Sequence, residues 1–161
     1  MNRHNMAPDA FLGFVHDIDV SVLAPDTALR DMIDALPGRK FIFTNGTQDH
    51  ATRVATRLGI GGLFHDIFDI VSANYVPKPN AQIYPAMLAQ FGIEAQRSAF
   101  FEDMARNLPP ARALGMTTVL LRDADTPDYG GPVGDEHIDH HAPDVKDILA
   151  RILKHLGRAS G

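Results

Sequence analysis

Residues 41–46 have the sequence FIFTNG, an apolar run of three residues followed by a hydroxyl, an amide and a glycine. Further short apolar runs lie at residues 67–71, 99–101 and 118–121, and each is too short to form a helix. Segments in which apolar residues recur at helical spacing separate these runs. Because this alternation is typical of an α/β domain with a mostly parallel sheet, the sequence predicts a strand at each of the four runs.

Four helices are predicted between and after these strands. Apolar residues repeat every three or four positions at 29–36 and at 84–91, so each set lines one helical face. A third helix is expected at 49–58, and a last one over residues 145–156 follows the pair Pro143-Asp144. The expected stop signals are Pro37-Gly38, Gly59 and Gly92.

Composition limits the class of protein. The 161 residues are 45% hydrophobic and 22% charged, with no Cys and a formal net charge of −5, which suits one globular domain. Without cysteine there is no disulfide, thiolate zinc site, iron–sulfur cluster or cysteine nucleophile. The acidic balance argues against nucleic-acid binding, and no apolar run reaches the roughly 20 residues that span a bilayer. With no signal-peptide core at its start, the chain is predicted to be cytoplasmic.

The first candidate site is the turn after the strand at 41–43. A turn at the carboxyl end of a parallel strand can direct the Thr44 hydroxyl and the backbone N–H groups of Asn45 and Gly46 at an anion such as phosphate. The alternative is an ordinary strand-to-helix turn in which Thr or Asn caps the following helix.

The second candidate site is Lys78, in the sequence VPKPN of residues 76–80. Prolines on both sides restrict the backbone, so the lysine is held on a stiff segment. This favours a positioned cation. The alternative is a solvated surface lysine, the usual environment of this residue type.

The third candidate site lies in residues 99–107, AFFEDMARN, where two carboxylates end an apolar strand. Glu102 and Asp103 offer the oxygen ligands that Mg²⁺ prefers, with water completing the shell. Asn107 lies about one helical turn beyond and can supply a neutral hydrogen bond. The alternative is a helix start at which acidic residues complement the helix dipole.

All three sites follow predicted strands, and the carboxyl ends of parallel strands meet at one edge of a sheet, where open α/β folds bind ligands. Phosphate donors, a fixed cation and a carboxylate metal site are the parts of a phosphoryl-transfer centre. The expected partner is therefore a small phosphorylated metabolite.

The ordered set FIFTNG, VPKP and FEDMARN, followed by ALGMTTVLLRD, resembles motifs two, three and four of the haloacid dehalogenase-like (HAD) phosphohydrolases. The context from residue 14 to residue 60 is similar to the pyrimidine 5′-nucleotidase branch. The resemblance implies a Rossmann-like three-layer sandwich with a mostly parallel sheet. It also implies an Mg²⁺-dependent hydrolase that acts on a nucleoside monophosphate or another small phosphomonoester through an aspartyl-phosphate.

The resemblance assigns roles to the candidate residues. Thr44 would hydrogen-bond the transferring phosphoryl group, aided by the amides of Asn45 and Gly46. Lys78 would neutralise that group and the nucleophile, and thus counts with Thr44 as catalytic. The metal ligands would be Glu102 and Asp103, which hold Mg²⁺ directly or through water. Asn107 stands where many relatives have Asp, and it is expected to support the site.

The nucleophile of this family belongs to an N-terminal DxDxT motif, which the sequence lacks in the expected place. We therefore expect a truncated chain, inactive alone, without its first central strand and most of its helical cap. Residues 1–36 would be the remnant of the cap and a linker helix, and residues 37–161 the HAD-like core. Loss of a central strand would leave its two neighbours unpaired or force them together, and the gap would favour self-association.

Other readings remain open. Asp17 and Asp19, in DIDVS, could serve as nucleophile and acid/base of a minimal capless phosphatase. A non-catalytic phosphate- or nucleotide-binding remnant is the alternative from another class. A phospho-acceptor receiver domain is disfavoured because its acidic pair should precede the Thr and Lys. The histidines of residues 137–141 fit no standard metal-ligand spacing, and a polar loop leading to a short edge strand explains them more simply.

Overall fold

The structure, a computed structural model, describes residues 18–123, 125–126 and 133–159. The chain divides into two units, residues 1–77 and residues 78–161, and each is described by itself. Residues 1–17 of the predicted cap remnant and linker, Asp17 among them, lie outside the described residues. The predicted boundary between residues 36 and 37 stays a prediction.

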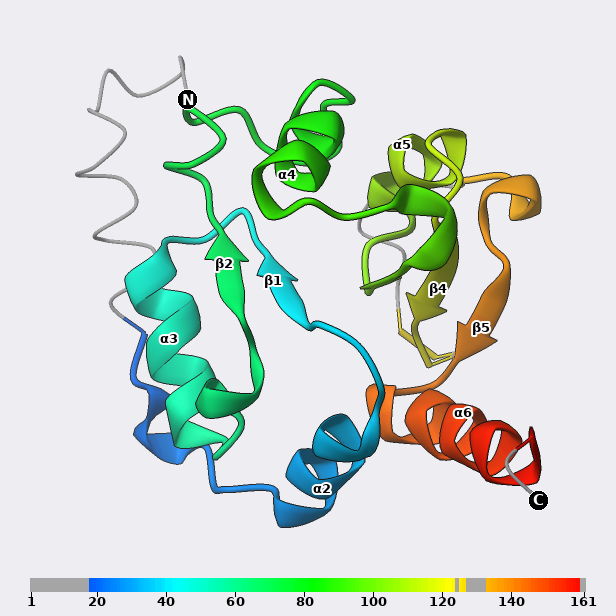
Figure 1. The fold of residues 1–161 in the computed structure, drawn as a ribbon. Helices are drawn as coiled ribbons and strands as arrows, with labels where there is room; N and C mark the ends of the chain where they lie inside the picture. Colours follow the sequence, from blue (N-terminus) through cyan, green and yellow to red (C-terminus); the bar gives the residue numbers. More distant parts are fainter. Residues whose placement is uncertain (1–17, 124, 127–132, 160–161) are drawn as a thin grey trace. The chain divides into compact units, whose positions relative to one another are not determined.

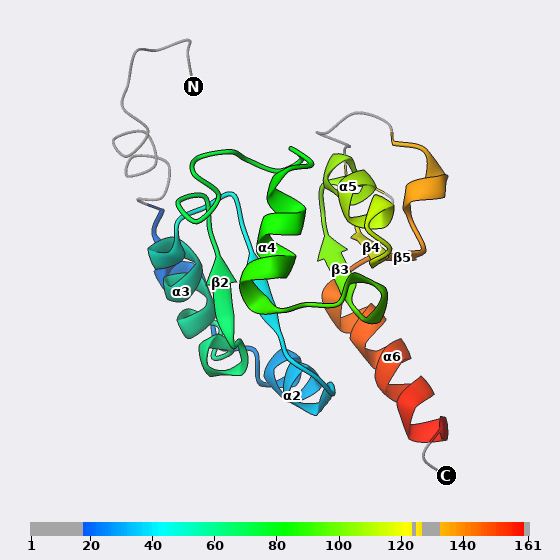
Figure 2. The same ribbon diagram turned by 45° about the horizontal axis from the view of Figure 1, so that its top comes forward.

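The first unit is built on two parallel strands. Strand β1 (Phe41–Phe43) pairs with β2 (Asp66–Phe68), with Phe41 opposite Asp66 and Phe43 opposite Phe68. Helix α2 (Thr27–Ala35) begins at Asp26, whose side chain accepts a hydrogen bond from the Leu29 N–H. Helix α3 (Gln48–Arg57) begins at Thr47 and runs beside β2 (Figures 1 and 2). A polar side chain before each helix thus satisfies an N–H that the helix leaves without an internal acceptor.

The second unit contains a three-stranded parallel sheet in the order β3-β4-β5. The strands are Ala99–Glu102, Thr117–Leu121 and His140–Ala142, and the helices are α4 (Ile83–Phe91), α5 (Leu108–Ala113) and α6 (Val145–Ala159). Val119, Ala142 and Ile148 form a buried cluster that joins β4 and β5 to α6. Apolar residues from strands and helix therefore build the core of this unit.

The α/β fold with parallel strands is confirmed, and so are the four predicted helices, whose ends lie within three residues of the expected ones. Gly92 ends α4 in the left-handed region, at φ 59°, as its role of stop signal requires. The edge strand expected near the histidines is β5. Helix α5 was not predicted, because Pro109-Pro110 suggests a loop, yet proline is tolerated in the first turn of a helix.

The strands differ from the prediction at the end of β2. Strand β2 ends at Phe68 and not at residue 71, because the chain turns at Asp69 and the Ala73 N–H bonds the Asp69 carbonyl at 3.0 Å. The described strands form one two-stranded sheet in the first unit, β1-β2, and one three-stranded sheet in the second, β3-β4-β5.

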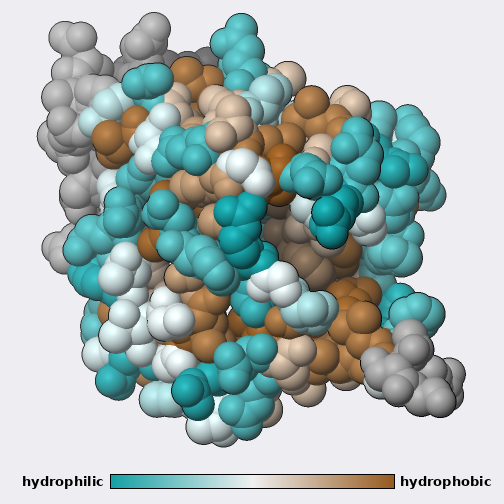
Figure 3. Space-filling model, in the orientation of Figure 1, coloured by the Kyte–Doolittle hydropathy of each residue, from teal (hydrophilic) through white to brown (hydrophobic). Residues whose placement is uncertain are grey.

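The surface carries few exposed large apolar side chains among the described residues, chiefly Ile18, Val22 and Val71. Hydrophilic and hydrophobic residues are interspersed over the face displayed in Figure 3. None of the helices in the described ranges combines the length and hydropathy that crossing a membrane requires.

Candidate functional site

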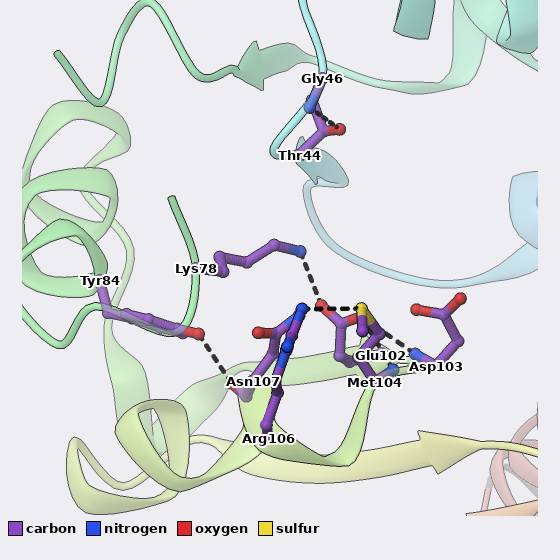
Figure 4. Close-up of polar contacts among 9 residues, drawn as sticks. All are labelled: Thr44, Gly46, Lys78, Tyr84, Glu102, Asp103, Met104, Arg106 and Asn107. Carbon is purple, nitrogen blue, oxygen red and sulfur yellow. Dashed lines mark hydrogen bonds and ion pairs between the residues drawn. The ribbon is translucent and has the colours of Figure 1, made fainter. Parts of the chain in front are cut away.

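Thr44 lies directly after β1, in the turn that leads to α3. Its backbone N–H donates to the Phe68 carbonyl at 2.9 Å, which continues the pairing of the two strands by one residue. Its side-chain oxygen Oγ1 accepts the Gly46 N–H at 2.9 Å (Figure 4). The Thr44 hydroxyl can still donate its hydrogen to an anion, whereas the Gly46 amide would first have to leave this bond.

Asp69, the residue directly after β2, binds the end of the Thr44 turn through its side chain. Its Oδ2 accepts the Gln48 N–H at 3.0 Å, and its Oδ1 accepts both the N–H and the hydroxyl of Ser72 at 2.8 Å. The residue is only 5% exposed. Burial alone raises the pKa of Asp69, but the hydrogen bonds from Ser72 and Gln48 outweigh it and hold the pKa below its usual value.

Lys78 and Glu102 form a buried ion pair in the second unit. The Lys78 Nζ lies 2.6 Å from the Glu102 Oε2, and the side chains are 9% and 6% exposed (Figure 4). The Lys78 ammonium also lies 5.3 Å from the centre of the Phe100 ring. The alternative of a solvated surface lysine is therefore wrong, because the side chain is buried against an opposite charge and an aromatic ring.

Glu102 is bound through both of its oxygens. Its Oε1 accepts the backbone N–H groups of Asp103 and Met104 at 3.1 and 3.2 Å. Burial raises the pKa of Glu102, the neighbouring Asp103 carboxyl adds to the rise, and Lys78 opposes it. Two carboxyl groups thus lie side by side, one buried and one exposed, and a divalent cation would relieve their repulsion. This donor set fits Mg²⁺ with water completing its shell.

Asn107 belongs to the short 3₁₀ turn Ala105–Asn107 and is 2% exposed. Its backbone carbonyl accepts a hydrogen bond from the Tyr84 hydroxyl at 2.8 Å, and Tyr84, itself 0% exposed, packs edge-on against Phe100. Burial raises the pKa of Tyr84, so its hydroxyl remains a donor. The Asn107 Oδ1 has no hydrogen-bond partner in the described part of the chain, which leaves a buried acceptor in this unit.

The histidine segment of residues 137–141 is attached to its neighbours through Asp139. Asp139 accepts the Thr118 N–H at 2.9 Å and pairs with Arg112 at 3.1 Å, which ties the segment before β5 to β4 and α5. Hydrogen bonds from Thr118 hold the pKa of Asp139 below its usual value. Within the described ranges, no group of three or more His, Asp and Glu side chains could hold a metal ion. The Glu102–Asp103 pair would therefore need further ligands.

Asp19, proposed as acid/base in the capless alternative, caps a 3₁₀ turn at Val20–Val22. Its Oδ1 accepts the Ser21 N–H at 2.8 Å. Hydrogen bonds from Ser21 hold the pKa of Asp19 below its usual value, and a low pKa disfavours a carboxyl as proton donor near neutral pH. Its partner in that alternative, Asp17, lies outside the described residues.

The structure brings Lys78 together with Glu102 and places Asp103 beside Glu102, while the Thr44 turn belongs to the other unit. The functional assignments of all seven candidate residues stay predictions: Thr44, Asn45, Gly46, Lys78, Glu102, Asp103 and Asn107. Sequence reasoning missed Asp69 and Tyr84. An acidic residue inside a predicted apolar strand was a signal for Asp69, whereas Tyr84 looked like any apolar residue of a helix face.

Two curated proteins share sequence with this chain. Bifunctional epoxide hydrolase 2 from Sus scrofa is 33% identical over 88 residues, which are 53% of this chain and 16% of that protein. Phosphate metabolism protein 8 from Saccharomyces cerevisiae is 29% identical over 111 residues, or 61% of this chain and 35% of that protein. The chain therefore spans well under half the length of these relatives.

Solved structures share the fold. A predicted phosphoglycolate phosphatase from Haemophilus somnus superimposes with a TM-score of 0.66 at 19% identity, covering 91% of this chain and 68% of that one. The L-2-haloacid dehalogenase from Xanthobacter autotrophicus, with chloropropionic acid covalently bound, gives a TM-score of 0.62 at 15% identity and covers 83% and 62%.

The family assignment rests on a longer match. The model of the haloacid dehalogenase-like hydrolases matches residues 10–115, which include the Thr44 turn, Lys78 and the Glu102–Asp103 pair. The predicted resemblance to this superfamily is thus confirmed, while the pyrimidine 5′-nucleotidase branch is a finer assignment. The chain belongs to the haloacid dehalogenase-like hydrolase family.

Proposed function

We propose that this chain carries most of the active site of an Mg²⁺-dependent phosphomonoester hydrolase of the pyrimidine 5′-nucleotidase type. Its substrate is a nucleoside monophosphate or another small phosphorylated metabolite. The observation that carries the proposal is the buried Lys78–Glu102 pair at 2.6 Å, with the exposed Asp103 next to it. A cation fixed beside a two-carboxylate ligand set suits a phosphoryl group, which requires neutralisation on several oxygens.

Each residue has a role in this proposal. By the family resemblance, the Thr44 hydroxyl donates to a phosphoryl oxygen and Lys78 neutralises phosphoryl charge, while Glu102 fixes the position of the ammonium. Glu102 and Asp103 hold Mg²⁺, which when bound lowers the cost of the negative charge that develops during transfer. Tyr84 fixes the backbone of Asn107, so the turn after the metal ligands keeps its shape.

The covalent step needs an aspartate from outside the described residues. Its carboxylate oxygen attacks phosphorus, the bond from phosphorus to the ester oxygen breaks, and a second carboxylic acid gives its proton to the leaving alkoxide. That second group then takes a proton from water, whose oxygen attacks the acyl-phosphate phosphorus. Inorganic phosphate leaves and the aspartate is restored. The sequence contains no Asp-x-Asp-x-Thr that could supply both groups.

Two other activities compete with phosphomonoester hydrolysis. Displacement of a halide from carbon requires no divalent cation, so the adjacent carboxylates Glu102 and Asp103 favour phosphomonoester hydrolysis. Phosphate or nucleotide binding without turnover is the second candidate, and the missing Asp-x-Asp-x-Thr favours it for the 161-residue chain alone. A cytoplasmic location, the absence of nucleic-acid and membrane partners, and self-association at unpaired strands stay predictions.

The decisive experiment compares this chain with a version extended upstream to include an Asp-x-Asp-x-Thr segment. Both proteins are assayed with Mg²⁺ against UMP, CMP, dUMP and several sugar phosphates. We expect turnover by the extended protein, loss of turnover with EDTA, and no turnover by the 161-residue chain. Failure of the extended protein to hydrolyse any phosphomonoester would contradict the enzymatic proposal. Activity of the shorter chain that Asp17→Asn abolishes would establish the capless alternative.

The metal site is tested by binding. Titration calorimetry with Mg²⁺ should give a binding signal for the wild-type chain and none for Asp103→Asn, which removes the exposed ligand. Asp147→Asn is the matched control, because Asp147 is an acidic residue on α6 that pairs with Arg151. Equal Mg²⁺ binding by all three proteins would contradict the assignment of Asp103.

A further inference from the structure

We infer that Asp69 is a positioning residue for the phosphate-binding turn of residues 44–48. The inference rests on the proposed function, because it assigns a task to Asp69 only if the Thr44 hydroxyl receives a phosphoryl oxygen. The carboxylate, together with Ser72, fixes the turn in the conformation that directs this hydroxyl outward from the end of β1.

Three hydrogen bonds attach the turn to the last residue of β2 and to the two residues that follow it. The first residue of the turn donates through the Thr44 N–H to the Phe68 carbonyl at 2.9 Å. Its middle accepts through the Gly46 carbonyl from the Ile70 N–H at 3.1 Å. Its end donates through the Gln48 N–H to the Asp69 Oδ2 at 3.0 Å. Only the third attachment uses a side chain, so it is the one that a substitution can remove.

A carboxylate is required at this position because both of its oxygens accept. Oδ2 receives the Gln48 N–H, and Oδ1 receives two donors from Ser72, all at 2.8–3.0 Å. Asparagine has one acceptor oxygen and an NH₂ group that only donates. Whichever way the amide is turned, it faces an N–H donor with another donor, at a residue that is 5% exposed. Asp69→Asn therefore releases either the start of α3 or the Ser72 turn.

The same carboxylate determines which groups remain for an anion. It occupies the first N–H of α3, and the Thr47 side chain accepts the His50 N–H at 3.3 Å. These two helix donors are therefore already bound, and phosphate depends on the Thr44 hydroxyl and the turn before the helix. A negative charge so near an anion site costs affinity by itself. The positioning effect must outweigh this cost.

The charge of Asp69 and its positioning effect predict opposite changes in phosphate affinity when Asp69 is substituted. If Asp69 acted only through its charge, Asp69→Asn would remove a repulsion and tighten phosphate binding. If Asp69 positions the turn, the same substitution weakens binding although it removes the negative charge. Asp66→Asn is the matched control, since Asp66 begins β2 three residues before Asp69, is exposed, and accepts the adjacent Ile67 N–H at 2.8 Å.

The experiment titrates orthophosphate into the ¹⁵N-labelled full chain and follows the amide signals of residues 44–48, well below the melting temperature of each variant. We expect the Kd of Asp69→Asn to rise about tenfold or more, equivalent to at least about 1.4 kcal/mol, and that of Asp66→Asn to change less than about twofold. Ser72→Ala, a milder change, should raise the Kd about two- to fivefold. Hydrogen exchange of the Gln48 or the Ser72 amide should accelerate in Asp69→Asn, and neither should accelerate in Asp66→Asn.

The outcomes separate the two proposals. If orthophosphate shifts the wild-type turn and Thr44→Val abolishes the shift, but Asp69→Asn binds as tightly or more tightly, the inference is overturned and the phosphate site stands. Unchanged exchange of both the Gln48 and the Ser72 amides in Asp69→Asn also overturns it, because the carboxylate would then hold nothing in place. If orthophosphate leaves the wild-type turn unshifted, the proposed phosphate site fails, and the inference fails with it.

Discussion

The two groups of candidate residues are held in place by different physics. The Thr44 turn depends on neutral backbone hydrogen bonds and one carboxylate, which shares its charge among three donors. The Lys78–Glu102 pair depends on two full charges that are both buried. Loss of one hydrogen bond leaves a single polar group unsatisfied, whereas loss of one charge leaves its partner buried without compensation. Substitutions in the Thr44 turn should therefore lower the free energy of unfolding by small amounts, whereas loss of Lys78 or Glu102 should lower it by much more.

The sharpest test of this difference removes one member of the pair. Glu102→Met should destabilise the protein by about 3–5 kcal/mol, because the buried Lys78 ammonium loses the Glu102 carboxylate. The double variant Lys78→Met/Glu102→Met should recover much of this loss, since two apolar side chains replace two charges. Urea unfolding of the single and double variants measures both quantities. A double variant as unstable as the sum of its singles would contradict the pair as the source of the effect.

Removal of the lysine should have a pH-dependent cost. Burial already raises the pKa of Glu102, and Lys78→Met takes away the one charge that opposes this rise. A carboxyl whose pKa is raised on folding contributes stability below its unfolded pKa and loses it as pH rises through the folded value. The cost of Lys78→Met relative to wild type should therefore grow between about pH 4 and pH 8, and thermal melts across this range test the trend. A constant difference would contradict it.

Asp69 should show the opposite dependence on pH. Hydrogen bonds hold the pKa of Asp69 below its usual value in spite of burial, so its contribution is present above the unfolded pKa of about 4 and is lost as pH falls through the folded value. At neutral pH, Asp69→Asn should cost about 1–3 kcal/mol, because a buried donor is left unpaired. This cost should shrink in melts below about pH 3.5. If it persisted at low pH, the ionised carboxylate would not be what stabilises the turn.

Tyr84→Phe should have a smaller effect. The substitution keeps the ring and its edge contact with Phe100 but removes the hydrogen bond to the Asn107 carbonyl, at a cost of about 1–2 kcal/mol in urea unfolding. Because the lost bond lies next to the proposed metal ligands, Mg²⁺ affinity should fall as well. An unfolding free energy and an Mg²⁺ affinity that both stay at their wild-type values in Tyr84→Phe would contradict this role of Tyr84.

The sequence predicted the elements better than their junctions. Apolar runs bounded by polar turns located β1, β3 and β4 because the run itself determines the strand. The end of β2 was missed because residues 70 and 71 continue the apolar run, while the turn depends on the buried Asp69 carboxylate and its bonds to Gln48 and Ser72. Local patterns contain no information about the bond to Gln48, which spans 21 positions of the chain.

The same limit applies to the candidate site. The prolines around Lys78 and the adjacent carboxylates predicted a fixed cation and an acidic ligand pair, and the structure joins them at 2.6 Å. That contact spans 24 positions and depends on both side chains being buried, which neither motif reveals alone. The bond from Tyr84 to Asn107, over 23 positions, had no signal in the sequence, because its acceptor is a backbone carbonyl. Motifs thus identify reactive groups, and packing selects their partners.

The smallest change in stability is expected at Thr44, where the effects on folding and binding can be separated. Thr44→Ser keeps the oxygen that accepts the Gly46 N–H and should alter stability by only about 0.5 kcal/mol. Thr44→Val removes that acceptor from a half-buried turn and should cost about 1 kcal/mol. Orthophosphate titration should then show binding close to wild type for Ser and none for Val, a loss far larger than the difference in stability. Binding retained by Thr44→Val would mean that the backbone of the turn, and not its hydroxyl, receives the anion.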